Sequence, residues 1–372
     1  ETKRGEGMTD FIHWLFAGPR HDSFTTFNRE DGYLEAIVRG FRSTILDQND
    51  YANLCQCETL EDMKIHLSQT DYADVLQNEG GAITPAILKE RCTDKMVNEF
   101  RYLRSMSADP LSKFLDFITY GYMIDNVILL ITGTLHERDT AELLERCHPL
   151  GMFKTIATLG ACHTVSDLYQ SVLIDTPLGP YISNYVPEED FGEENVEVIR
   201  NTLYRAYLRD FYNFCHYQGG ATEEIMKDIL DFEADRRSIT ITINSFGTEL
   251  SMDDRAKLFP DFGTLYPAGT ARLAKAADID QVRESVSYLS QYRRLFADFS
   301  GGASTSDKSL EDTFFEYEVQ LNKLAFETQM GYGVFYAYFK LREQEIRNIV
   351  WIAECIAQGQ KAQIHQGLIP IF

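Results

Sequence analysis

The sequence lacks the motifs by which many enzymes are recognised. It contains no phosphate-binding P-loop, no dinucleotide-binding glycine fingerprint, no HExxH zinc motif and no G-x-S-x-G nucleophile turn. Gly301-Gly302 is followed by Lys308 in a Ser- and Thr-rich stretch, but the P-loop spacing is absent and a flexible connector is favoured. The sequence therefore gives no positive indication of catalysis or of a bound cofactor.

Basic residues are scarce relative to acidic ones. There are 35 Lys and Arg against 57 Asp and Glu, so the formal net charge is −22 and the pI is near 4.7. Such a chain repels phosphate backbones and anionic lipid headgroups. We therefore expect no direct binding to nucleic acid, and we expect any membrane association to depend on protein partners.

Long uninterrupted apolar runs are also missing. Phe114–Leu135 is long enough to span a bilayer but contains Asp116, Asp125 and Asn126, and its unbroken apolar run is only Val127–Ile131. A carboxylate at the bilayer centre costs about 2.5–3.5 kcal/mol on insertion scales. The segment is therefore predicted to be a buried helix of a soluble protein.

Cysteine is present, but not in the pattern of a disulfide framework. The number of cysteines is odd, at seven, which favours free thiols in a reducing compartment. Three are followed by histidine, in Cys147-His148, Cys162-His163 and Cys215-His216. Adjacent residues on a helix point in different directions, so buried thiols with capping or core histidines are favoured and no metal site is predicted. The alternative is a zinc-dependent hydrolase whose site uses either these Cys-His pairs or the acidic loop at 188–194.

Helical spacing dominates the chain. Apolar positions follow one helix face in Tyr33–Ile45, Leu203–Phe214 and Val319–Leu341. Only Ile239–Ile243 (ITITI) alternates with the period of a strand. Loops are indicated at Asn78–Pro85 and Asp298–Asp307 by their Gly, Pro, Ser and Asn content.

Two sets of apolar positions recur in the same order, roughly 110 residues apart. The first set is Leu60, Met63, Leu67 and Leu76, then Val165, Leu168, Val172 and Tyr181, then Ile279, Val282, Val286 and Leu295. The second set is represented by Val127, Ile239 and Ile349. Because the counterparts of Ile239–Ile243 stand in helix-like segments, we predict a helix there, against its β propensity.

The repeat predicts an all-α fold of three related helical-bundle domains about a pseudo-threefold axis. The expected divisions are an N-terminal extension at 1–27, repeat 1 at 28–140, repeat 2 at 141–250, and repeat 3 with a C-terminal tail at 251–372. Asp125, Arg237 and Arg347 hold neighbouring or equivalent positions in the three repeats and are candidates for a shared central socket. In the alternative, each charge pairs locally within its own bundle.

At this point several long strings resemble a known family, that of subunit d of eukaryotic V-type proton-pumping ATPases and of the C subunit of archaeal and bacterial rotary ATPases. The strings include Gly32–Gly40 (GYLEAIVRG), Cys147–Gly151 (CHPLG), Phe232–Leu250 (FEADRRSITITINSFGTEL), Asp254–Pro260 (DRAKLFP) and Ile369–Phe372 (IPIF). The resemblance runs from about Asn28 to Phe372 and departs at the N-terminal extension and at Asp298–Asp307.

The resemblance implies a funnel-shaped, non-catalytic subunit of the membrane (V0) sector, without catalytic residues or cofactors of its own. Its expected partners are the central-stalk subunits D and F, the proteolipid c ring and other membrane-sector subunits. Its expected place is peripheral, on the cytosolic face of vacuolar and endolysosomal membranes, where it would couple stalk rotation to proton transport by the ring. A helical scaffold for endolysosomal trafficking is a further alternative.

Overall fold

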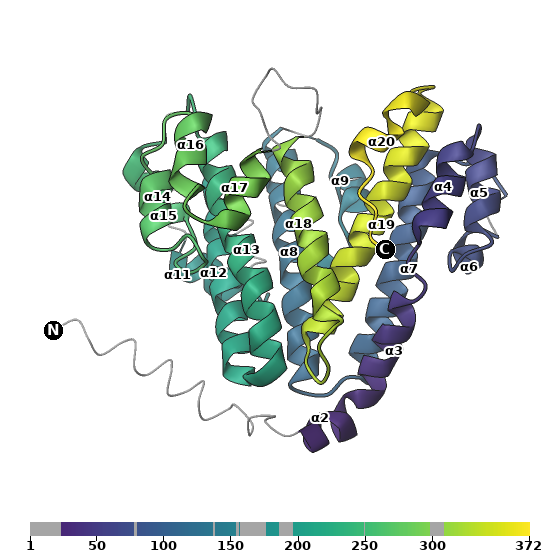
Figure 1. The fold of residues 1–372 in the computed structure, drawn as a ribbon, viewed down its shortest axis with the longest axis horizontal. Helices are drawn as coiled ribbons and strands as arrows, with labels where there is room; N and C mark the ends of the chain where they lie inside the picture. Colours follow the sequence, from purple (N-terminus) through teal and green to yellow (C-terminus); the bar gives the residue numbers. More distant parts are fainter. Residues whose placement is uncertain are drawn as a thin grey trace.

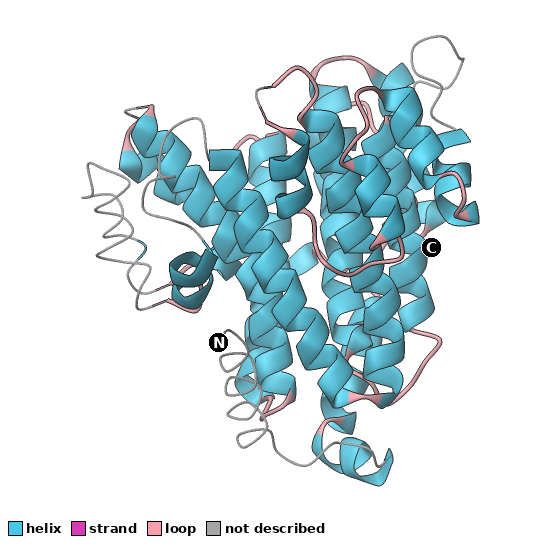
Figure 2. Ribbon diagram, turned by 90° about the vertical axis from the view of Figure 1, so that its left-hand side faces the viewer, coloured by secondary structure: helices cyan, strands magenta, loops and turns pink. Residues whose placement is uncertain are grey.

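The structure is a computed structural model that describes residues 24–77, 80–136, 138–153, 156, 176–185, 196–248, 250–297 and 309–372. These residues form 18 α-helices and two short 3-10 helices (Figure 1). Within these ranges no strand is present (Figure 2), which confirms the all-α prediction for the part of the chain that is described. The acidic loop at 188–194 and the loop predicted at Asp298–Asp307 lie outside the described residues.

The helices up to residue 151 are α2 (Phe24–Glu30), α3 (Gly32–Arg42), α4 (Gln48–Gln56), α5 (Leu60–Leu67), α6 (Ala73–Leu76), α7 (Pro85–Met106), α8 (Leu111–Leu135), α9 (Thr140–Arg146) and the 3-10 helix η1 (Pro149–Gly151). Those that follow are α11 (Gly179–Tyr185), α12 (Val196–Gln218), α13 (Gly220–Asn244), α14 (Met252–Leu258), α15 (Ala268–Leu273), α16 (Ile279–Val286), α17 (Ser290–Ala297), α18 (Leu310–Ala325), α19 (Gly333–Ala357), η6 (Lys361–Gln363) and α20 (Ile364–Gly367).

Six long helices form the frame of the molecule. They lie side by side in the order α7, α19, α18, α13, α12 and α8, and α8 also contacts α19 (Figure 1). The helices α8, α13 and α19 each have 25 residues. Short helices gather beside this frame in two groups, α4–α6 and α14–α17, at opposite sides of the view.

Local sequence explains where the short helices start. Thr59 and Asp278 accept a hydrogen bond from the backbone N–H of the third residue of α5 and α16, which satisfies one of the free amide groups at each helix start. Both helices have eight residues and bury two of their three predicted repeat positions, Met63 and Leu67 in α5 and Val282 and Val286 in α16, whereas Leu60 and Ile279 are half-buried. The corresponding positions of the second copy, Val165, Leu168 and Val172, lie outside the described residues.

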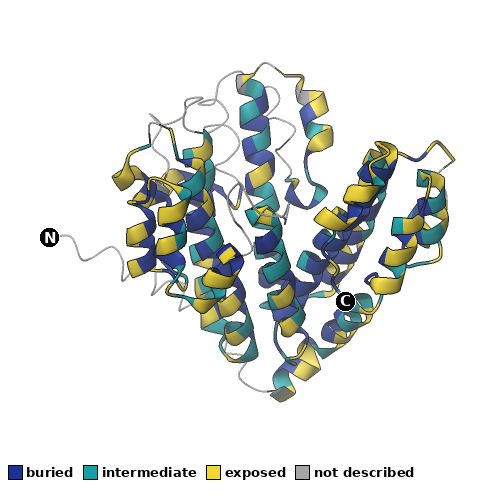
Figure 3. Cartoon of the chain, turned by 45° about the horizontal axis from the view of Figure 1, so that its top comes forward, coloured by how far each residue is buried: buried dark blue, intermediate teal, exposed yellow. Residues whose placement is uncertain are grey.

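The described residues form two hydrophobic clusters in the interior. The larger one extends from Phe27 to Ile371 and joins α3–α8 to α12, α13 and α19, and the smaller one joins the other side of α13 to α14–α18. Figure 3 shows buried residues on the facing sides of the long helices and exposed residues on the outer sides. The larger cluster draws residues from each of the predicted repeats 28–140, 141–250 and 251–372, whose boundaries remain a prediction.

Aromatic side chains fill much of the contact between α8 and α12. Phe117 stacks on Phe211 with ring centroids 5.1 Å apart and an interplanar angle of 8°, and Phe114 meets Phe211 edge to face at 5.3 Å. Such rings bury large apolar areas and pack in few arrangements, which makes the frame stiff.

The helical prediction for Ile239–Ile243 is confirmed, because these residues lie within α13. The prediction of a continuous helix over Val319–Leu341 is wrong, since α18 ends at Ala325 and α19 begins at Gly333. The break is fixed by tertiary contacts: the Tyr332 amide donates to Thr222 Oγ1 at 2.9 Å, and a Cβ on Gly331 would lie 3.0 Å from that of Ala221.

The apolar segment Phe114–Leu135 falls within α8. By length and composition alone, Leu111–Thr134 could cross a membrane, with a mean hydropathy of 1.5. However, α8 packs against α9, η1, α12 and α19, and Asp116 accepts from Arg104 Nε at 2.6 Å. The segment is therefore a helix of the packed fold, as predicted from its charged residues.

Candidate functional site

The three candidate socket residues lie on three of the long helices. Asp125 is on α8, Arg237 is on α13 and Arg347 is on α19. Asp125 and Arg347 are exposed, and the Arg237 side chain keeps 21% of its exposure. Each of the three therefore stands on a helix, as predicted, and the question is whether the fold brings them together.

Tyr204 of α12 links Asp125 to Arg237. The Arg237 guanidinium carbon lies 3.3 Å from the centre of the Tyr204 ring, a cation–π contact. The Tyr204 hydroxyl donates to the Gly121 carbonyl at 3.1 Å, one helical turn before Asp125. Burial raises the pKa of Tyr204, with a further contribution from the nearby Asp125 carboxylate. Tyr204 is therefore a neutral side chain that bridges α8, α12 and α13.

Glu233 gathers two arginines on α13. Arg237 Nε donates to Glu233 Oε1 at 2.7 Å, and Arg236 Nε donates to Oε2 at 2.9 Å. Burial alone would raise the pKa of Glu233, but the two guanidinium groups and Lys340 lower it to about 2. Arg237 thus pairs locally on its own helix, as in the alternative to a shared socket, while its contact with Tyr204 crosses between helices.

Phe315 of α18 connects this group to Arg347. The Arg347 guanidinium carbon lies 3.6 Å from the centre of the Phe315 ring, and that of Arg236 lies 5.9 Å from it. Arg347 also donates to Gln344 on its own helix. One aromatic ring therefore has an arginine from α13 and an arginine from α19 beside it.

A charged stripe on α19 completes the arrangement. Lys340 Nζ donates to Glu343 Oε2 at 3.0 Å, and Glu343 accepts a hydrogen bond from the Tyr122 hydroxyl of α8. Lys340 and Glu343 keep 28% and 20% of their side-chain exposure. We call these residues the central polar cluster: Tyr122, Asp125, Tyr204, Glu233, Arg236, Arg237, Phe315, Lys340, Glu343 and Arg347.

The central polar cluster therefore takes side chains from α8, α12, α13, α18 and α19. Sequence reasoning missed Glu233, Lys340 and Glu343, although Lys340, Glu343 and Arg347 follow one helical stripe at intervals of three and four residues. The cluster combines three acidic and four basic side chains and offers no nucleophile beside a general base. Its chemistry is that of a structural or docking surface.

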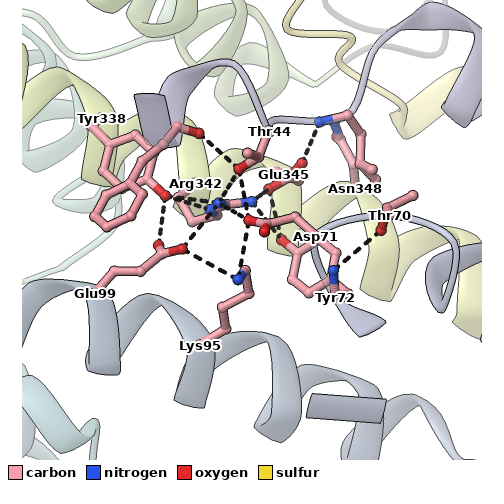
Figure 4. Close-up of polar contacts among 12 residues, drawn as sticks. Thr44, Thr70, Asp71, Tyr72, Lys95, Glu99, Tyr338, Arg342, Glu345 and Asn348 are labelled. Atoms are coloured by element: carbon pink, nitrogen blue, oxygen red, sulfur yellow. Dashed lines mark hydrogen bonds and ion pairs between the residues drawn. The ribbon is translucent and has the colours of Figure 1, made fainter. Parts of the chain in front are cut away.

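A second polar network surrounds Arg342, whose side chain is fully buried (Figure 4). Its guanidinium lies 2.6 Å from Glu345 on the same helix, 3.2 Å from Asp71 and 3.3 Å from Glu99 of α7. Lys95 of α7 lies 3.1 Å from the same Asp71 carboxylate. Removing one member would leave buried charges unpaired, which typically costs about 3–5 kcal/mol.

The Cys-His pairs do not form metal sites in the described part of the chain. Cys147 and Cys215 are buried free thiols. His148 Nδ1 accepts from the Leu150 amide at 3.2 Å, and burial lowers the pKa of this imidazole to about 4. Cys162-His163 lies outside the described residues. No group of three or more His, Cys, Asp or Glu side chains within the described ranges could hold a metal ion.

Comparison with known proteins identifies the family. The model of the "ATP synthase (C/AC39) subunit" family matches residues 34–367. The V-type proton ATPase subunit d of Dictyostelium discoideum is 62% identical over 96% of this chain and 99% of that protein. The V-type proton ATPase subunit d of Saccharomyces cerevisiae is 45% identical over 91% of this chain and 97% of its own. The C subunit of the A-type ATP synthase of Thermococcus kodakarensis is 19% identical over 89% of this chain and 88% of its own.

These matches cover nearly the whole chain and agree with the strings on which the resemblance rests. They confirm the sequence-based predictions of a V0-sector component of a proton-pumping ATPase and of a non-catalytic subunit. The chain therefore belongs to the C/AC39 subunit family, the family of V-type proton ATPase subunit d.

Proposed function

We propose that this chain joins the central stalk of a V-type proton ATPase to its proteolipid c ring, so that ATP hydrolysis elsewhere in the complex drives proton transport. Subunits D and F form the stalk in this proposal, and the chain is a peripheral protein on the cytosolic face of vacuolar and endolysosomal membranes. The observation that carries the proposal is the match to V-type proton ATPase subunit d along almost the full length of both chains.

The geometry supports a mechanical role. A coupler must transmit force without deforming, and the aromatic contacts and close packing of six long helices provide such stiffness. The proposed shape is a funnel of three related domains about a pseudo-threefold axis, with the boundaries predicted at 28–140, 141–250 and 251–372. In this arrangement the central polar cluster lies where the long helices of all three units meet.

The charge of the chain supports docking rather than catalysis. A net charge of −22 favours basic complements on the stalk or ring, which would orient the chain in the complex more than they would add affinity. Asp125, Arg237 and Arg347 would then provide local charges for docking on a largely acidic molecule.

Purification from detergent-solubilised membranes tests the proposed place of the chain. The chain should elute with the proteolipid ring and the stalk subunits. Elution apart from the pump, with trafficking proteins, would support the scaffold alternative and contradict our proposal. One tightly held zinc per chain, lost on substitution of Cys162, His163, Cys215 and His216 by Ala, would support the hydrolase alternative.

Charge reversal tests the central polar cluster. We expect Arg237→Glu and Arg347→Glu each to reduce proton transport per ATP hydrolysed by more than about half. The free energy of unfolding should fall by no more than about 2 kcal/mol in Arg347→Glu, whose side chain is exposed, and by about 3–5 kcal/mol in Arg237→Glu, which places a second carboxylate beside buried Glu233. The readouts are acidification and phosphate release by the assembled pump, with thermal unfolding of the chain.

Lys257→Glu is the matched control for these reversals. Its side chain is 73% exposed and pairs only with the nearby Asp254 among the described contacts. It should leave coupling unchanged. Equal coupling in all three variants would show that the central polar cluster is structural and takes no part in transmission.

A further inference from the structure

Glu345 of α19 holds the start of the group formed by α4–α6, which we call the first lobe. This carboxylate is fully buried, and its Oε1 accepts from the Leu46 amide at 2.6 Å. Its Oε2 accepts from the Tyr72 hydroxyl at 2.7 Å (Figure 4). A backbone amide and a tyrosine thus fasten the first lobe to the last long helix of the chain.

Asp235 of α13 makes the same two contacts with the group formed by α14–α17, which we call the third lobe. It is also fully buried, and it accepts from the Leu265 amide at 3.0 Å and from the Tyr292 hydroxyl at 2.6 Å. Asp235 and Glu345 each lie four residues before a repeat position, Ile239 in one helix and Ile349 in the other. The two carboxylates are therefore equivalent anchors.

The residues that these anchors hold correspond as well. Leu46 lies 14 residues before Leu60, the first repeat position of the first lobe, and Leu265 lies 14 residues before Ile279, its counterpart in the third lobe. The backbone amide at each anchor therefore comes from the same position of its repeat. The donor amides and the acceptor carboxylates therefore agree in position, although neither was used to define the repeat. The tyrosine donors differ by one residue, because Tyr72 follows Leu60 by 12 residues and Tyr292 follows Ile279 by 13.

The third 25-residue helix has a polar anchor at a different repeat position, one residue before Val127 instead of four. Asn126 of α8 is buried, and its side chain accepts from the His148 amide at 2.7 Å and donates to the His148 carbonyl at 2.9 Å. Gly151 follows, where an added Cβ would clash with the Tyr122 carbonyl group. The segment after α8 is therefore held to α8 by the Asn126 side chain and by the close contact of Gly151 with the Tyr122 backbone.

The helices around the first and third lobes show the same arrangement. In the first lobe, α5 contacts α19 and α6 contacts α7. In the third lobe, α16 contacts α13 and α17 contacts α18. Each lobe therefore contacts two long helices. One is the next long helix in the sequence, α7 or α18, and the other is a 25-residue helix of another predicted repeat, α19 or α13. For the third lobe that other helix is α13, which precedes it directly, whereas for the first lobe it is α19, near the end of the chain.

The length of the connecting chain differs greatly among the anchors. His148 is 22 residues from Asn126, and Leu265 is 30 residues from Asp235, whereas Leu46 is 299 residues from Glu345. The entropic cost of bringing the two ends of a connection together rises with the logarithm of its length. The connection between Leu46 and Glu345 is therefore the costliest of the three to close. The contact between Glu345 and the first lobe closes this longest of the three connections, beside the packing of α3, α5 and α7 on α19.

Arg342 supplies additional interactions at that contact. It bridges Glu345 to Asp71 and Glu99 and donates to Thr44 Oγ1 at 3.1 Å. The equivalent position of α13, three residues before Asp235, is Phe232, whose ring packs on Phe314 and Tyr317. The charged network is thus present at the anchor with the longest connection and is replaced by apolar packing at the equivalent anchor.

We propose that Arg342 and Glu345 close a ring of three units. In this ring a polar side chain on each 25-residue helix holds the start of the next unit. The contact of Arg342 and Glu345 with the first lobe then positions this lobe for the transmission of rotation. Arg342 and Glu345 are positioning residues in this inference, since they act through the lobe that they hold. The inference rests on the proposed coupling function for its second half, while the closure itself can be tested on the chain alone.

Tyr72→Phe is the variant that tests the closure, because it removes only the hydroxyl that donates to Glu345. Tyr292→Phe removes the equivalent hydroxyl at Asp235 and is the matched control. By hydrogen exchange on the full chain, Tyr72→Phe should speed exchange of the Leu46 amide and of α4–α6 by about tenfold, the effect of one lost short hydrogen bond, since the bond that the same hydroxyl accepts from Arg342 is long at 3.4 Å. Exchange in α14–α17 should stay as in the unmodified chain.

In the assembled pump, Tyr72→Phe should lower the protons transported per ATP hydrolysed, whereas Tyr292→Phe should leave this ratio unchanged. Arg342→Lys should enlarge the effect, because an ammonium group cannot keep all the guanidinium contacts, and Arg255→Lys controls for the loss of a buried arginine. Unchanged exchange at Leu46, or equal loss of coupling in both tyrosine variants, would overturn the inference. If the unmodified chain fails to restore transport to a pump that lacks it, the proposed function is wrong, whatever the exchange result.

Discussion

At the scale of single residues, a buried carboxyl group affects stability more than an exposed ion pair does. Lys257 and Asp254 form an ion pair with side chains 73% and 53% exposed, and such pairs contribute little to stability. Asp235 is different, because it is fully buried and accepts hydrogen bonds from the Thr264 and Leu265 amides. Its protonation is therefore coupled to folding.

Burial raises the pKa of Asp235 to about 6, against the hydrogen bonds donated by Tyr292 and the two amides. The folded state thus holds this proton more tightly than the unfolded state, so its contribution to stability is greatest at low pH and is lost as pH rises through about 6. Relative to Asp235→Asn, the free energy of unfolding should fall by up to about 3 kcal/mol between about pH 4 and pH 7.

Denaturant titrations of the two chains across this pH range provide the measurement, and the difference between the chains removes the contribution of other groups. A constant difference would mean that Asp235 has the same pKa in the folded and unfolded states. A difference of the opposite sign would mean that the donated hydrogen bonds outweigh burial.

At the scale of secondary structure, two glycines within helical segments should respond oppositely to substitution. Gly151 in η1 approaches α8 so closely that a Cβ would clash with the Tyr122 backbone. Gly40 lies within α3, and nothing is within 4 Å of the position of its Cβ. We expect Gly151→Ala to destabilise the chain by about 2–4 kcal/mol, through backbone displacement.

Gly40→Ala should instead stabilise the chain by about 0.5–1 kcal/mol, because alanine loses less conformational freedom in a helix than glycine does. Equilibrium unfolding of both variants measures these changes. Little effect from Gly151→Ala would show that η1 can move away from α8 at small cost, so that the close approach at Gly151 does not anchor this segment.

The same scale shows what could and could not be predicted from sequence. The repeat identified the ITITI segment as helical because its counterparts share apolar positions with longer helices. It could not predict the break between α18 and α19, since the apolar spacing continues across Gly331 while the turn depends on Thr222, far away in the chain. Helix faces were readable because they depend on near neighbours, whereas this turn depends on a tertiary contact.

The candidate site was predictable only in part for the same reason. Asp125, Arg237 and Arg347 were found because charges entered apolar helical segments at related positions. Their contacts with Tyr204 and Phe315 could not be read from spacing, because these rings come from other helices. Arg342 and Glu345 carried no signal of their role, since their partners lie up to 299 residues away.

At the scale of the whole molecule, stiffness is the property on which the proposed coupling depends. Aromatic packing between the long helices, the central polar cluster and the anchored lobes all restrict relative motion of the parts. Force applied to one side of such a body reaches the other side with little deformation. Loss of the chain should therefore separate ATP hydrolysis from proton transport, without removing a catalytic group.

The most direct measurement is ATP-driven acidification of vesicles whose pump lacks this chain, before and after addition of the purified full-length chain. We predict that acidification is absent without the chain and returns on its addition, while the catalytic subunits keep ATP-hydrolysing activity when assayed apart from the membrane sector. Full acidification by vesicles free of this chain and of any related subunit would contradict the proposed coupling.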